Sequence, residues 1–77
     1  MAYDTATHMA LGFAQRVANA GARKVIPPPN WRLLFVRASG PVPIELTRSF
    51  GLPISASWFQ LAEALAVNLP GQTPIQL

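Results

Sequence analysis

The stretch that decides the fold runs from residue 31 to residue 50 and reads WRLLFVRASGPVPIELTRSF. In its first part, Trp31, Leu33 and Phe35 alternate with other residues, as side chains on one face of a β-strand do. The residues between them are also apolar, which is typical of a strand covered on both faces. We interpret residues 31–38 as such a strand.

The second part of this stretch follows a turn at residues 39–41. Beyond the turn, Val42, Ile44 and Leu46 alternate with other residues, which is again a strand pattern. A second strand here would pair with the first and close a β-hairpin over residues 31–50.

The same second part also fits a short helix. Pro43 suits the first helical position, and Glu45 would lie in the first turn, where the helix dipole favours an acid. Gly51 would then stand at the C-terminal cap. We favour the hairpin, with residues 44–50 as the segment that distinguishes the two interpretations.

A helix is expected on each side of the 31–50 stretch. Residues 4–22 carry an apolar stripe at helical spacing, and Asp4 can accept a hydrogen bond from a free amide of the first turn. Residues 57–69 begin with Ser57 and Gln60, the pattern of a capping box. This second helix is apolar around most of its circumference, which indicates a core helix or an interface helix.

Taken together, these elements predict an α+β fold in a single small domain covering residues 1–77. It would consist of an N-terminal helix, a short β-hairpin and a C-terminal helix, with proline-rich spacers. The spacer at residues 25–30 contains three consecutive prolines, and residues 70–77 are expected to form an extended tail. Pro27, Pro28 and Pro29 before an aromatic residue also resemble a ligand for an aromatic-lined groove, but a stiff spacer is the simpler interpretation.

The composition limits how such a chain can be stabilised. It has 77 residues and no cysteine, so disulfides and thiolate metal sites are excluded. Only 12% of the residues are charged, about half the usual share, while 51% are hydrophobic. Apolar groups must therefore face outward, and a partner or a second copy of the chain is the expected means of covering them.

Catalytic and cofactor chemistry find little support in the sequence. Asp4 and His8 lie four residues apart on one helical face, but two ligands without a third make a poor metal site. No Ser-His-acid set, close acidic pair or phosphate-binding glycine loop occurs. We expect a protein that is not an enzyme and has no cofactor.

An alternative function is suggested by residues 46–53, which read LTRSFGLP and resemble the turn region of a helix-turn-helix DNA-binding regulator. The following helix would be the recognition helix, yet it contains no arginine or lysine. The six basic residues are dispersed along the chain, whereas nucleic-acid binders usually cluster them. Any binding to nucleic acid is therefore expected to be weak.

The leading hypothesis is a non-enzymatic protein-binding subunit, or an accessory or inhibitor protein, that docks on a larger protein assembly or forms a homo-oligomer. A strand at residues 44–50 would favour this hypothesis, and a helix there would favour the DNA-binding regulator. The expected partner-binding residues are Trp31, Phe59, Ala66 and Val67. No segment is long and apolar enough to span a membrane, and no secretory signal is recognised, so a cytoplasmic location, or one within a phage particle, is expected. Arginine preferred over lysine, with abundant alanine, proline and glycine, suggests a bacterial or phage origin.

Overall fold

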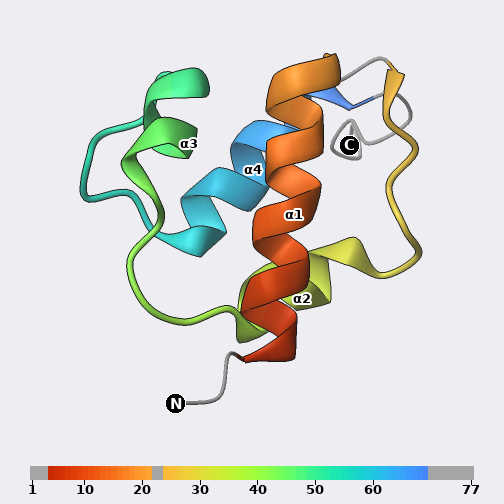
Figure 1. Ribbon diagram of the computed structural model, residues 1–77, viewed down its shortest axis with the longest axis horizontal. Coiled ribbons are helices and arrows are strands. Elements are labelled where there is room, and N and C mark those ends of the chain that lie inside the picture. Colours follow the sequence, from red (N-terminus) through yellow and green to blue (C-terminus); the bar gives the residue numbers. More distant parts are fainter. Residues whose placement is uncertain (1–3, 22–23, 70–77) are drawn as a thin grey trace, which may run out of the picture.

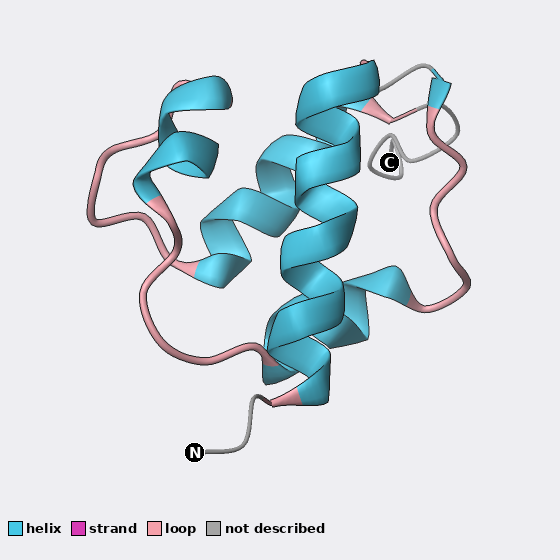
Figure 2. Ribbon diagram, viewed as in Figure 1, coloured by secondary structure: helices cyan, strands magenta, loops and turns pink. Residues whose placement is uncertain are grey.

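The computed structural model describes residues 4–21 and 24–69. These residues form four helices and no strand (Figures 1 and 2). The helices are α1 (Thr5–Ala20), α2 (Trp31–Arg37), α3 (Ile44–Ser49) and α4 (Trp58–Asn68).

The prediction of an α+β fold with a β-hairpin over residues 31–50 is wrong, because this stretch forms α2 and α3. In a helix, residues four apart share one face, so Trp31 and Phe35 both enter the core. Leu33, which a strand would have placed beside them, is 50% exposed. A helix of seven residues is marginal alone, so α2 is stabilised by the packing of Trp31 and Phe35 against α1 and α4.

Helix α3 follows the alternative interpretation of residues 44–50. Glu45 lies in its first turn and Arg48 in its last turn, both favourable for the helix dipole. Pro43 stands at the N-cap position, one residue before the helix begins. Leu46 and Thr47 are buried, and the Thr47 hydroxyl donates a hydrogen bond of 2.9 Å to the carbonyl of Ile44.

The outer helices α1 and α4 begin as their caps predict. The Asp4 carboxylate accepts a hydrogen bond of 3.3 Å from the Ala6 amide. At α4, the Gln60 amide donates to the Ser57 hydroxyl at 3.2 Å, and the Ser57 amide donates to the Gln60 side chain at 2.8 Å. The confirmed capping box fixes where α4 begins.

The segments between and after the helices are described in part. Residues 25–28 have no regular secondary structure, as a proline-rich spacer should. The left-handed backbone of Asn30 directly precedes α2. The predicted tail at residues 70–77 lies outside the described residues.

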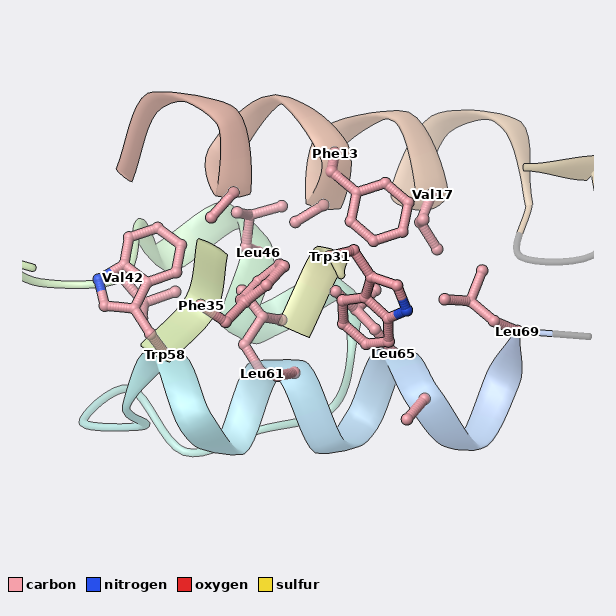
Figure 3. Close-up of a cluster of buried hydrophobic side chains, with 14 of the residues drawn as sticks. Phe13, Val17, Trp31, Phe35, Val42, Leu46, Trp58, Leu61, Leu65 and Leu69 are labelled. Atoms are coloured by element: carbon pink, nitrogen blue, oxygen red, sulfur yellow. The ribbon is translucent and has the colours of Figure 1, made fainter. Parts of the chain in front are cut away.

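The hydrophobic core lies between α1 and α4, with aromatic side chains from α2 inserted between them (Figure 3). Phe35 makes edge-to-face contacts with Phe13, Trp31 and Trp58, with ring centroids 5.5–6.3 Å apart. The indole N–H of Trp58 donates a hydrogen bond of 2.9 Å to the carbonyl of Gly40. This bond ties the loop between α2 and α3 to the start of α4.

Replacing either of two glycines by alanine should change the stability of the fold, in opposite directions. Gly12 lies inside α1, where an added Cβ would approach only the Arg16 guanidinium, at 3.9 Å. Gly12→Ala should therefore raise the free energy of unfolding by about 0.5–1 kcal/mol. Gly51 has a left-handed backbone with φ of 67°, so Gly51→Ala should lower it by about 1–2 kcal/mol. Urea denaturation of both variants checks the prediction, which a loss of stability in Gly12→Ala would contradict.

Candidate docking groove on α2 and α4

A surface groove with a volume of about 390 Å³ lies between α2 and α4. Side chains from both helices line it, and most of them are apolar. We call it the α2–α4 groove, lined by Arg32, Phe35, Val36, Phe59, Ala62, Glu63, Ala66 and Val67.

Helical spacing explains why α4 contributes five of these residues. Phe59, Ala62 and Ala66 follow one another at intervals of three and four, and so lie along one stripe of the helix. Leu61 and Leu65 form the neighbouring stripe, which is fully buried in the core. Helix α4 therefore has two adjacent apolar stripes, one inside the core and one along the groove.

The floor and the rim of the groove differ in exposure. Phe35, Ala62 and Ala66 are buried and form its floor. Val36, Phe59 and Val67 are 71%, 64% and 68% exposed. Three large apolar side chains thus stand in water around an apolar hollow, a combination that is usual at contact sites.

The groove carries one positive and one negative side chain, from different helices. Arg32 comes from α2 and its guanidinium lies over the Trp31 ring, with 5.4 Å between the guanidinium carbon and the ring centroid. Glu63 comes from the middle of α4 and is exposed. Within the described part of the chain, these two side chains form no ion pair with each other. Each of these charged side chains can therefore pair with an opposite charge on another molecule.

Three of the four predicted partner-binding residues meet in this groove, namely Phe59, Ala66 and Val67. Their contact with a partner stays a prediction. Trp31 lies elsewhere: it is only 4% exposed and packs against Phe13 and Phe35 in the core (Figure 3). A buried Trp31 also favours the interpretation of the preceding prolines as a spacer, because a proline-rich ligand needs its aromatic residue on the surface.

The contribution of α2 to the groove was not predicted from the sequence. Arg32 and Val36 were assigned to a strand paired with residues 42–47, whereas in the structure they belong to α2 and line the groove beside α4. The interval between Trp31 and Phe35 could not reveal the helix, because residues four apart share a face in a strand as well.

Asp4, one member of the Asp4 and His8 pair, has a structural role. One Asp4 carboxylate oxygen accepts from the Ala6 amide, and the other accepts a hydrogen bond of 2.9 Å from the Thr7 hydroxyl. The Thr7 hydroxyl in turn accepts from the Ser39 amide at 2.8 Å. The Asp4 carboxylate thus starts α1 and anchors the loop after α2. Residues 4–21 and 24–69 contain no group of three metal-ligating side chains.

Comparisons of the chain with protein-family models, with curated proteins and with solved structures find no match. Among the helices of the described residues, none combines the length and the hydropathy needed to cross a membrane.

The two stripes of α4 predict different outcomes for two serine substitutions. Phe59→Ser changes an exposed side chain and should alter the free energy of unfolding by no more than about 0.5 kcal/mol. Leu61→Ser removes volume from the core and buries a hydroxyl, so it should cost about 3 kcal/mol or more. Circular dichroism during urea denaturation measures both. Equal destabilisation by the two substitutions would mean that the groove stripe is part of the core.

Proposed function

We propose that this chain is a non-enzymatic protein-binding subunit that docks through the α2–α4 groove. The observation that carries the proposal is the exposure of Val36, Phe59 and Val67 around an apolar floor. Burying apolar surface is worth about 25 cal/mol per Å², so a protein surface that covers these side chains would be held mainly by the hydrophobic effect.

The low charge of the chain supports the same function. Interfaces are depleted of charged side chains at their centres and enriched in aromatic ones. The groove has Phe59 on its rim and only Arg32 and Glu63 as charged residues. The other lining residues are all apolar, namely Phe35, Val36, Ala62, Ala66 and Val67.

A helix-turn-helix regulator is the second candidate. Residues Ile44–Ser49 form a helix, as this motif requires and a hairpin would not allow. The details of α4 weigh against it. Residues 50–57 separate α3 from α4, whereas the turn of this motif has about three or four residues. The exposed side of α4 presents Phe59, Glu63 and Val67 and no cation. We therefore rank protein binding first.

DNA binding, where it occurs, should be weak and steeply dependent on salt. Arg32, Arg37 and Arg48 are exposed, but no base-reading set accompanies them on α4. Fluorescence anisotropy with random duplex DNA should give affinities that fall steeply as salt rises from about 50 to 200 mM. Selection of one sequence with nanomolar affinity at physiological salt would support the regulator and contradict our ranking.

Site-specific photo-crosslinking tests the groove as a docking surface. Benzoylphenylalanine replaces Phe59 in one variant and Ile54 in a control variant. Ile54 is 73% exposed and lies outside the groove lining. In extracts of the cells that produce the chain, position 59 should give a discrete cross-linked product and position 54 should not.

A second experiment tests whether the cross-linked product depends on the residues of the groove. Adding Val67→Ser or Val36→Ser to the position 59 variant should reduce the yield several-fold, because each removes part of the apolar rim. Equal yields from positions 59 and 54, or a product that is insensitive to both serine substitutions, would reject the groove as the docking surface.

A further inference from the structure

We propose that the occupant of the α2–α4 groove is a second copy of this chain, bound about a two-fold axis that passes through the groove. This inference rests on the proposed function and names the partner. It commits to a symmetric homodimer in which each copy presents the same residues to the other.

The charges of the groove support a second copy. A two-fold interface brings each residue of a patch opposite the complementary part of the same patch, so the patch must be self-complementary. Among the described residues, the groove has one cation, Arg32 on α2, and one anion, Glu63 on α4. A two-fold axis between the two helices allows Arg32 of each copy to face Glu63 of the other. Both charges are then paired, without any further charged residue.

The shape of the groove is also self-complementary. Ala62 and Ala66 have small side chains and leave a hollow beside α4. Phe59 stands on the same helix, 64% exposed, and is the largest projecting side chain of the groove. A self-complementary patch needs both a projection and a hollow, and here Phe59 of one copy can enter the alanine-lined hollow of the other.

The size of the chain gives a reason for a second copy to bind. A domain of this length buries a modest share of its surface and usually needs disulfides, a metal or oligomerisation for support. The chain has no cysteine. Homodimer interfaces are also more apolar than interfaces between proteins that fold separately, as this groove is.

Charge reversal and its rescue test the proposal. Sedimentation equilibrium over roughly 1–100 µM should give a monomer–dimer equilibrium for the unchanged chain. Arg32→Glu alone and Glu63→Arg alone should each weaken the dimer by about tenfold or more, because each places like charges opposite one another twice. Combining the two substitutions in one chain should restore the dimer. An equimolar mixture of the two single variants should also restore it, as a heterodimer.

Matched reversals on α3 provide the control. Glu45→Arg and Arg48→Glu change the net charge by the same amounts at exposed positions outside the groove, and should leave the dimer unchanged. Circular dichroism confirms that every variant is folded.

Two results would overturn the second copy as occupant. One is a folded chain that remains monomeric up to roughly 100 µM. The other is a dimer that Arg32→Glu and Glu63→Arg weaken without mutual rescue. The position 59 cross-link separates this failure from failure of the proposed function. A product of twice the chain mass agrees with the dimer, while a groove-dependent product of another mass rejects the dimer and retains the protein-binding subunit.

Discussion

The contacts of the Phe35 ring are the constraint on which the rest of the structure depends. Phe13 from α1, Trp31 from α2 and Trp58 from α4 surround this one ring in edge-to-face geometry. Edge-to-face pairs add about 0.5–1.5 kcal/mol each beyond the burial of their area. Because these contacts join three of the helices, α2 must stay helical and must keep its Phe35 face inward. Arg32 and Val36, which flank Phe35 on the surface of α2, are thereby fixed beside the groove and exposed to solvent.

Local capping chemistry made α1 and α4 predictable, and its absence made α2 unpredictable. Asp4 and Ser57 are side-chain caps whose hydrogen bonds lie within a few residues of sequence. Helix α2 follows Asn30, whose side chain makes no capping hydrogen bond. Its seven residues are also too few for a period of 3.6 to be told from a period of two. Its helical state is decided by packing against α1 and α4, which a single sequence does not display.

The candidate site was predictable to the extent that it lies on α4. The apolar circumference of that helix exceeds what one core can cover, so Phe59 and Val67 could be assigned to a second face from sequence alone. Ala66 was assigned to the same flank and is buried, because it lies on the floor of the groove. Trp31 was chosen for its size, which is equally a reason for a small core to enclose it. The side of the groove that α2 forms depends on tertiary packing, and the predicted hairpin had no such surface.

The groove follows from a mismatch in helix length. At about 1.5 Å per residue, α2 extends about 10 Å and α4 about 16 Å, so α2 covers only part of the length of α4. Helix α3 packs on α1, and none of its residues lines the groove. Helix α2 ends at Arg37, where the backbone of the C-cap residue Ala38 is extended, and Pro41 and Pro43 follow in the loop. The short length of α2 is thus one reason why Phe59 and Val67 of α4 are left exposed. No rearrangement of side chains can cover them without a surface from another molecule or from elsewhere in the chain.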